Sequence, residues 1–429
     1  MAKTLQYSVP NEENIVRVVL DNGITVLVYE NFSAQSVVLA GSFDAGSVWD
    51  IPEKSGLAAL VANSLIRGTE TRDFDTLHRT MEDLAADLNF GASKHNTSFS
   101  GKALAEDFGM LADLLADTLR HPVFPADHVE RLRGEWLTGL RYRQQDSGWL
   151  ASRAFRQMLY PVEHPYHHSS QGTLDSIPQL SLDDMRAFHS RHYGPKDMKI
   201  VVVGALKATD AVQILREHLG DWINVDQPES SDLPELTTLG EPKRGNIVVQ
   251  GKKQTNLMLG AVGPSRYEPE FRAASLANSI LGQFGMMGRI GDVVREREGL
   301  AYYAGSQITG GQGPGAWSIN AGVDPTHVER AIDLCLGEVR RITSEPVSDD
   351  DIADNKSYFI GRLPLQLENN EGIAASLLTI ETYQLGLNYL LSYRDIIQAI
   401  TKDELLHAAQ KYLNADAMVI SVAGPGEHG

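Results

Sequence analysis

The sequence predicts an α+β protein with two homologous domains in tandem, each built from a mostly antiparallel sheet with helices packed on one face. Three observations support this fold class. The chain has 429 residues, which is too many for one ordinary hydrophobic core. Two segments of the chain match each other at a fixed offset, and blocks of expected strands alternate with blocks of expected helices.

The repeat relates residues 184–204 (DMRAFHSRHYGPKDMKIVVVG) to residues 403–423 (DELLHAAQKYLNADAMVISVA). At an offset of 219 residues, Tyr193 aligns with Tyr412. In both segments an amphipathic helix is followed by a turn and then by an apolar strand. We therefore expect a duplicated unit of roughly 210 residues.

A linker separates the two copies. Residues 226–245 contain three prolines and five acidic residues and show no periodicity, which is typical of a linker. The expected division is an N-terminal domain over residues 1–225 and a C-terminal domain over residues 246–429.

Within the first copy, an Asn22-Gly23 turn precedes an apolar run, and a second apolar run follows. Alternating small and polar residues indicate a third strand, and longer amphipathic stretches indicate helices. The expected strands are 24–30, 36–43 and 92–101, and the expected helices are 55–67, 73–88, 104–120 and 126–145. In the second copy we expect strands at 255–263, 300–309 and 316–324, with helices over 268–298.

Composition excludes several classes of protein. Thirty-eight basic residues against 56 acidic ones give a net charge of −18, so no basic surface for nucleic acid is expected. The single cysteine, Cys335, excludes an intrachain disulfide and a cysteine-based metal site. The sequence contains no run of about 18 apolar residues, so no membrane-spanning helix is expected. The first residues, MAKTLQYSVPNEEN, lack the apolar core of a signal peptide, which favours the cytoplasm, or the periplasm if a signal has been removed.

The histidine-rich segment 164-HPYHH-168 suggests zinc, because neutral imidazoles bind zinc when they lie one helical turn apart. Pro165 disrupts a helix at this place, and only Glu163 adds a nearby carboxylate. A loop with surface histidines is the favoured interpretation.

Two glycine-rich segments, 282-GQFGMMG-288 and 310-GGQGPG-315, lack the lysine of a phosphate-binding loop. The first lies in an expected helical region. The second lies between two expected strands, as a hairpin turn would. Whether the Gly310–Gly315 loop contacts a substrate stays open.

The segment 289-RIGDVVREREGLAYYAGS-306 contains the most specific candidate residues. Arg295 lies in the last turn of an expected helix, and Gly299 is placed to end that helix in the left-handed conformation. The strand that follows brings Tyr302 to the same edge. An arginine donates to carbonyls or carboxylates, and a tyrosine hydroxyl donates to a developing oxyanion. Spacing alone favours a structural ion pair and a half-buried aromatic over a functional pair.

Four stretches together carry a family resemblance: residues 21–30 (DNGITVLVYE), 46–69 (GSVWDIPEKSGLAALVANSLIRGT), 164–177 (HPYHHSSQGTLDSI) and 294–306 (VREREGLAYYAGS). Over roughly residues 14–424 the chain resembles the pitrilysin/insulysin-type metallopeptidases, or inverzincins. It is most similar to the short two-domain branch that includes the mitochondrial processing peptidase and the core proteins of the mitochondrial cytochrome bc complex.

The resemblance implies a lost metal site. Active members carry H-x-x-E-H, in which two histidines bind zinc and the glutamate is the general base. This chain has Ala59 and Asn63 at the histidine positions and Ala62 at the glutamate position. Gly139 stands where the distal glutamate ligand is expected. We therefore expect no zinc in this chain and no peptide hydrolysis by this chain alone.

The resemblance also implies a retained pair, because the family's Arg/Tyr pair falls on Arg295 and Tyr302. Some short-branch members are heterodimers in which one subunit carries H-x-x-E-H and zinc while the other carries the pair. This chain is similar to the second kind, with a homologous partner and a peptide substrate; whether it forms a homodimer in isolation stays open. The alternatives are a structural subunit like the core proteins of the bc complex and a stand-alone enzyme with other chemistry.

Overall fold

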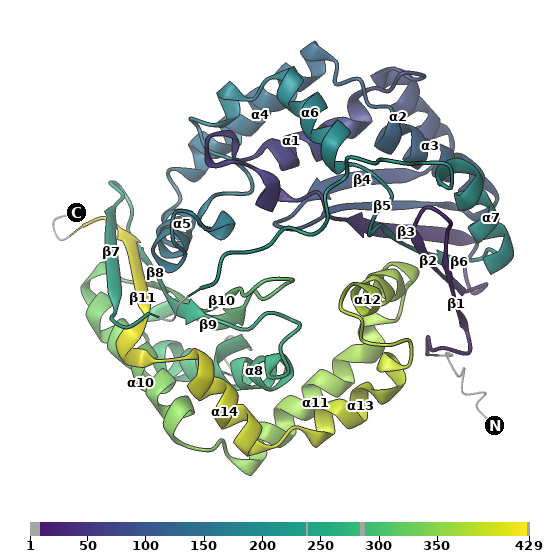
Figure 1. Cartoon of the computed structure of the whole chain (residues 1–429). Coiled ribbons are helices and arrows are strands. Elements are labelled where there is room, and N and C mark those ends of the chain that lie inside the picture. Colours follow the sequence, from purple (N-terminus) through teal and green to yellow (C-terminus); the bar gives the residue numbers. More distant parts are fainter. Residues whose placement is uncertain (1–8, 237–238, 284–287, 427–429) are drawn as a thin grey trace. The chain divides into compact units, whose positions relative to one another are not determined.

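A computed structural model describes residues 9–236, 239–283 and 288–426 (Figure 1). Of the N-terminal segment discussed above, residues 1–8 lie outside the described residues. The chain divides into two compact units. Unit 1 comprises Met1–Thr138, Ser169–Asp232 and Arg362–Tyr393, and unit 2 comprises Gly139–His168, Leu233–Gly361 and Arg394–Gly429. Each unit therefore includes a segment from the other half of the chain.

The sheet of unit 1 has the strand order β1-β2-β6-β3-β5-β4. Only β2 and β6 pair in parallel, and the other neighbours are antiparallel. The strands are β1 (Ile15–Val19), β2 (Thr25–Glu30), β3 (Ser36–Phe43), β4 (Asp87–Ala92), β5 (Thr97–Leu104) and β6 (Lys199–Gly204). The mixed, mostly antiparallel sheet confirms the predicted fold class.

The helices of unit 1 are α1 (Leu57–Ser64), α2 (Phe74–Asp83), α3 (Phe108–Arg120), α6 (Leu182–His192), α7 (Ala208–Leu219) and α12 (Asn370–Thr382). Three helices contain residues of both units: α4 (Ala126–Arg143), α11 (Asp349–Gln366) and α13 (Tyr389–Ala399). Short helical turns are η1 (Ser47–Trp49), η2 (Pro52–Lys54), η3 (Leu65–Arg67), η4 (Ala105–Asp107) and η6 (Ile177–Gln179).

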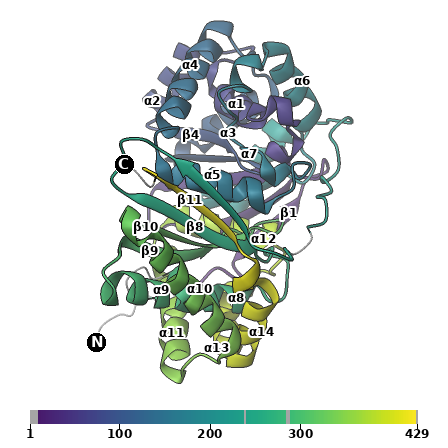
Figure 2. The same ribbon diagram turned by 90° about the vertical axis from the view of Figure 1, so that its left-hand side faces the viewer.

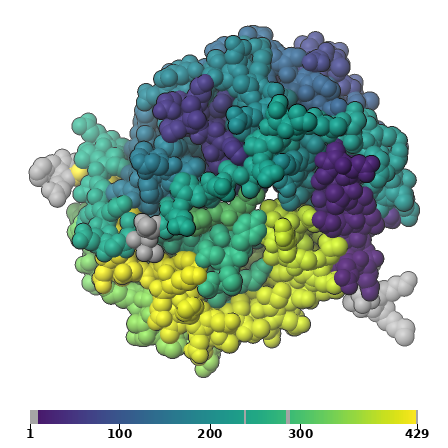
Figure 3. All heavy atoms as spheres, in the orientation of Figure 1, coloured from purple at the N-terminus to yellow at the C-terminus, as the bar shows by residue number. Residues whose placement is uncertain are grey.

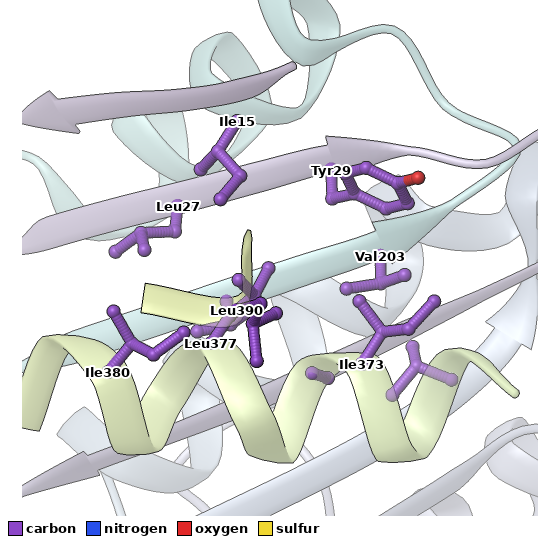
Figure 4. Packing of buried hydrophobic residues seen from close by; sticks show 11 residues of the cluster. Ile15, Leu27, Tyr29, Val203, Ile373, Leu377, Ile380 and Leu390 are labelled. Atoms are coloured by element: carbon purple, nitrogen blue, oxygen red, sulfur yellow. The ribbon is translucent and has the colours of Figure 1, made fainter. Parts of the chain in front are cut away.

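Helix α12, from the C-terminal half of the sequence, completes the core of unit 1. Its apolar residues Ile373 and Leu377 pack against Leu27 and Val203 of the sheet (Figure 4). Successive side chains of a strand point to opposite faces. Val28, which follows Leu27 in β2, therefore lies on the other face of the sheet, where it is also buried. Helices thus cover both faces of this sheet, whereas the sequence predicted them on one.

The sheet of unit 2 has the order β7-β11-β8-β10-β9, with only β7 and β11 parallel. The strands are β7 (Lys243–Val248), β8 (Thr255–Val262), β9 (Ala301–Ile308), β10 (Ala316–Val323) and β11 (Val419–Gly424). The helices are α5 (Ser147–Leu159), α8 (Phe271–Asn278), η7 (Ser279–Gln283), α9 (Arg289–Gly291), η9 (Asp292–Arg297), α10 (Val328–Ser344) and α14 (Lys402–Tyr412), with short turns η5 (Pro165–His167), η10 (Pro325–His327) and η11 (Ala415–Ala417).

The two units repeat the same plan. Ser36 and Thr255, which begin β3 and β8, are 219 residues apart, as are Thr97 and Ala316, which begin β5 and β10. In unit 2, α5 from the N-terminal half packs against β8 and β11, as α12 packs in unit 1 (Figure 2). The repeat seen in the sequence therefore extends to an exchange of one helix between the halves.

Two details differ from the expected elements. Residues 92–101 are not one strand, because a turn at Ser93–Asn96 separates β4 from β5 and the Ser93 N–H donates to the Asn96 carbonyl at 2.8 Å. The expected linker also includes the start of β7, at Lys243.

The edge strand β1 lies at the surface of unit 1, where its Val16 and Val19 are exposed (dark purple in Figure 3). In the part of the chain that the structure describes, no helix is both long and apolar enough to cross a membrane.

Candidate functional site

Helix α1 carries three of the four positions at which the resemblance implies lost chemistry. Ala59 and Ala62 are fully buried, so their methyl groups are part of the packed interior of unit 1. The Asn63 side chain turns back on its own helix, because its Nδ2 donates to the Ala59 carbonyl at 2.8 Å. The two methyl groups offer no ligand atom to a metal ion, and the carboxamide oxygen of Asn63 is the one such atom among these three side chains.

A partly buried carboxylate fixes the start of α1. Asp50 Oδ2 accepts from the Gly56 N–H at 2.8 Å, and Oδ1 accepts from the Ala58 N–H at 2.9 Å. Burial raises the pKa of Asp50 to about 7, although these backbone donors act to lower it. Gly56 has a φ of +96°, a conformation that favours glycine. The beginning of α1 is therefore well defined even though its chemistry is absent.

Gly139, the fourth position, lies inside α4. A Cβ atom added there would meet no heavy atom within 4 Å. The glycine is thus not required by a close approach of other atoms.

Arg295 and Tyr302 come together through a short helix-to-strand connection in unit 2. Arg295 lies in η9, a π-helical segment, and π-helical turns are frequent at functional sites. Gly299 follows with a φ of +65°, and its N–H donates to the Arg295 carbonyl at 3.1 Å. Strand β9 then begins, and the Arg295 guanidinium carbon lies 5.9 Å from the centre of the Tyr302 ring. The predicted left-handed glycine and the predicted proximity of the two side chains are both observed.

A β-bulge explains why Tyr302 points outward. Gly322 of β10 pairs with Tyr303, but the next residue, Val323, pairs with Ala301, so Tyr302 is an extra residue in the ladder. The Tyr302 side chain is consequently 81% exposed. It is not the half-buried aromatic that spacing alone favoured. Bulges of this kind redirect side chains next to active sites.

The guanidinium of Arg295 is positioned by weak contacts. Its Nε lies 3.6 Å from the Glu296 carboxylate, and the side chain remains about one-third exposed. A guanidinium carries five N–H donors, and the central carbon of this group lies beside the Tyr302 ring. The pair can therefore donate to two neighbouring oxygen atoms of a ligand.

The histidine-rich segment is a structural turn of unit 2. His164 is 1% exposed, and its Nδ1 accepts from the Tyr166 N–H at 3.0 Å. His167 Nδ1 lies 2.8 Å from the Tyr160 carbonyl, and His168 Nε2 lies 2.8 Å from the Val162 carbonyl. The expectation of surface histidines is wrong for His164, because the residue caps η5 from inside the unit.

Of the two glycine-rich segments, residues 284–287 of the first lie outside the described residues. The second is the β9–β10 hairpin connection, as predicted. A Cβ at Gly310 would lie 2.1 Å from the Pro264 carbonyl oxygen, and one at Gly313 would lie 2.3 Å from the Tyr166 hydroxyl. These glycines are needed because the loop packs closely against its own unit.

Comparison with known proteins identifies the family. Residues 25–159 match the family described as insulinase (peptidase family M16), and residues 179–359 match the peptidase M16 inactive domain. The solved structure of a peptidase M16 inactive domain from Pseudomonas fluorescens is 30% identical, with a TM-score of 0.88 over 96% of this chain and 98% of that one. The chain belongs to the M16 peptidase family.

Two further proteins extend this comparison. A protease from Helicobacter pylori has the same fold, with a TM-score of 0.88 at 18% identity over 97% of this chain and all of that one. An uncharacterized zinc protease of Streptomyces coelicolor is 23% identical over 95% of this chain and 89% of its own length. The finer resemblance to the processing-peptidase branch is not resolved by these relatives.

Zinc, which the names of such relatives imply, does not fit the residues of this M16 chain. At the positions where the resemblance implies the zinc ligands and the general base, the chain has two methyl groups, a glycine and one carboxamide, whereas zinc prefers imidazole, thiolate and carboxylate. Within residues 9–236, 239–283 and 288–426, no group of three or more His, Cys, Asp or Glu could hold a metal ion.

Sequence analysis missed two features of this region. The Asp50 cap is separated from α1 by η2, so no local capping pattern reveals it. The bulge at Tyr302 depends on how β9 pairs with β10, and that pairing is not encoded in β9 alone.

Proposed function

We propose that this chain is the non-zinc subunit of a heterodimeric M16 metallopeptidase and that it supplies Arg295 and Tyr302 to the active site of its partner. The partner is a homologous chain with an intact H-x-x-E-H motif, which binds zinc and provides the general base. The observation that carries this proposal is the exposed Tyr302 phenol, presented on a β-bulge beside the Arg295 guanidinium.

The two side chains have separate tasks in peptide hydrolysis. The Tyr302 hydroxyl donates a hydrogen bond to the oxyanion that forms when the scissile carbonyl is attacked. Arg295 donates to a neighbouring carbonyl of the substrate and so holds the peptide in register. Extended peptides bind at sheet edges through backbone hydrogen bonds, and β4 and β9 are edge strands of their sheets. The net charge of −18 favours basic peptides weakly.

A second candidate function is a structural subunit without a catalytic role. It is favoured by the inert side chains of α1 and by the similar Pseudomonas fluorescens structure, which is described as an inactive domain. The exposed pair favours the catalytic proposal, because a purely structural subunit gains nothing from presenting it.

The test is to purify this chain and a homologous chain that carries H-x-x-E-H, and to measure zinc content and peptide-library cleavage for each alone and for the mixture. We expect zinc in the homologous chain only and strong cleavage only in the mixture. Stoichiometric zinc or full activity in this chain alone would contradict the proposal. A homologous chain that is fully active alone, and unchanged on mixing, would instead support the structural candidate.

A further inference from the structure

A single row of residues crosses the sheet of unit 2 beside the bulge. Tyr303 of β9 pairs with Gly322 of β10, which in turn pairs with Asn256 of β8. The Tyr303 ring lies over Gly322, where an added Cβ would stand 2.6 Å from the ring carbon Cε1. Gly322 has no side chain of its own, and the Gln254 side chain shares this space with the ring, its Nε2 standing 1.7 Å from that Cβ. The Tyr303 hydroxyl reaches across Gly322 and donates to Asn256 Oδ1 at 2.6 Å.

The row continues to the beginning of α5. Asn256 Nδ2 donates to the buried Ser147 Oγ at 2.6 Å, and Ser147 is the first residue of α5. Asp146 caps the same helix by accepting from the Trp149 N–H at 2.9 Å. Helix α5 is itself fixed, because its Ala151 packs in a buried cluster with residues of β11 and its neighbours. The Tyr303 hydroxyl is therefore connected to a well-anchored point of unit 2.

The start of β9 needs such a connection. Strand β9 is an edge strand, and Tyr302 as the bulge residue has no partner in the ladder. A bulge disrupts the ladder locally, so side-chain contacts on either side of it decide where the bulged residue points. Tyr303 is the first residue after the bulge, and its hydroxyl reaches Asn256 two strands away in the sheet.

We propose that Tyr303 is a positioning residue whose hydroxyl, through Asn256, ties the bulged end of β9 to the first turn of α5 and thereby sets where the Tyr302 phenol stands. This inference rests on the proposed function for its effect on catalysis, but not for its effect on the structure. A misplacement of about 1 Å can cost up to a hundredfold in rate.

The activity test uses Tyr303→Phe, which removes only the hydroxyl, in the mixture with the zinc-binding partner. We expect kcat to fall about tenfold with KM within about twofold, since the peptide still binds while the oxyanion donor is displaced. In a Tyr302→Phe background the same change should have no further effect. An equal, multiplicative loss in both backgrounds, or no loss in either, would overturn the inference. Tyr160→Phe, which removes another tyrosine hydrogen bond of unit 2, to the Pro314 carbonyl, is the matched control and should leave kcat unchanged.

A second readout needs neither partner nor activity. With 3-fluorotyrosine at position 302, the fluorine resonance of the full chain should shift or broaden on Tyr303→Phe and stay unchanged on Tyr160→Phe. An unchanged resonance in the Tyr303→Phe chain would refute the positioning role. If the wild-type mixture is inactive, the proposed function fails while this resonance still decides the positioning role, so the two failures are distinguishable.

Discussion

Helix α1 of unit 1 and the η9 segment of unit 2 each contact an edge strand of their own sheet, α1 against β4 and η9 against β9. In α1 the positions at which the resemblance implies the zinc motif hold Ala59 and Ala62, which are fully buried, and Asn63, which bonds to its own helix. In η9–β9, Arg295 lies beside Tyr302, whose phenol is exposed. Under the proposed function, only the second of these regions contributes chemistry.

Folding stability explains the small side chains of α1 but not the exposed phenol of Tyr302. The methyl groups of Ala59 and Ala62 fill the interior of unit 1 and need no hydrogen-bond partner, so folding accounts for these residues. A phenol that is 81% exposed contributes little to folding, and surface substitutions usually change stability by less than about 0.5 kcal/mol. An interaction outside the chain is therefore the better explanation for a bulge that presents this phenol.

The largest expected effect is that of Tyr302→Phe. In the mixture with the zinc-binding partner, kcat should fall by about 10²–10³, or roughly 3–4 kcal/mol, because an oxyanion donor is lost. Stopped assays over a range of peptide concentrations would separate kcat from KM, and elemental analysis should find the zinc content of the complex unchanged.

The control for this prediction is Tyr142→Phe, which removes an equally exposed phenol hydroxyl from α4. It should leave kcat and thermal stability unchanged. If Tyr302→Phe is as active as the wild type, Tyr302 has no part in the mechanism and the comparison between the two regions loses its functional meaning.

The second prediction concerns the packing of α1. Ala59→His should destabilise the protein by about 1–3 kcal/mol, because a large polar ring enters a fully buried site. Asn63→His, at a half-buried position on the same helix, should cost less than about 1 kcal/mol. Urea denaturation of the two variants gives the comparison. Equal costs would mean that the interior around Ala59 can still open to accept a ligand side chain.

The third prediction concerns pH and the start of α1. The pKa of Asp50 is raised to about 7 in the folded protein, against about 4 in the unfolded chain, so between these values the folded state binds the extra proton. The stability contributed by this proton is complete below about pH 4 and is lost as the pH rises through 7. We expect the free energy of unfolding to fall by about 1–2 kcal/mol more between pH 5 and pH 8 in the wild type than in Asp50→Asn.

Asp73→Asn is the matched control for this pH profile. Asp73 also caps a helix, α2, but its pKa is lowered by hydrogen bonds from Thr76, so it does not titrate in that window. Its profile should run parallel to that of the wild type. If the profile of Asp50→Asn also ran parallel to that of the wild type, the Asp50 carboxylate would be ionised in the folded state over the whole range from pH 5 to pH 8.

Local patterns predicted what local chemistry determines. The apolar runs at residues 36–43 and 255–263 are strands, and Gly299 ends its helix as expected. The turn at Ser93–Asn96 was missed because it contains neither glycine nor proline, the usual signals. The exchange of α5 and α12 could not be predicted, since an amphipathic pattern shows that a helix face is buried but not against which sheet.

The candidate site was likewise predictable only where residues close in the sequence determine it. The spacing of Arg295 and Tyr302 indicated that the two side chains meet, and they do. Their exposure was not predictable, because it follows from the pairing of β9 with β10 rather than from the sequence of either strand. The proposed role of Tyr303 was equally hidden, since its partner Asn256 lies 47 residues away along the chain, and Ser147, the partner of Asn256, lies 109 residues from Asn256.

The smallest expected effect is at Gly139, the fourth position at which the resemblance implies a metal ligand. Glycine in a helix interior costs about 1 kcal/mol relative to alanine, and an added Cβ at Gly139 meets nothing within 4 Å. Gly139→Ala should therefore stabilise the protein by about 0.5–1 kcal/mol in urea denaturation. Gly134→Ala, at another open position of the same helix, should give a similar gain.

The pair of glycine variants also decides whether position 139 keeps any role in the assembled enzyme. A glycine retained for a close approach by substrate or partner would make Gly139→Ala slow the mixture while Gly134→Ala does not. We instead expect Gly139→Ala and Gly134→Ala to show equal activity and equal stabilisation, because no heavy atom lies within 4 Å of the position that a Cβ would take at Gly139. In that case the former ligand position is free to vary, and the chemistry that this chain contributes is confined to the η9–β9 connection.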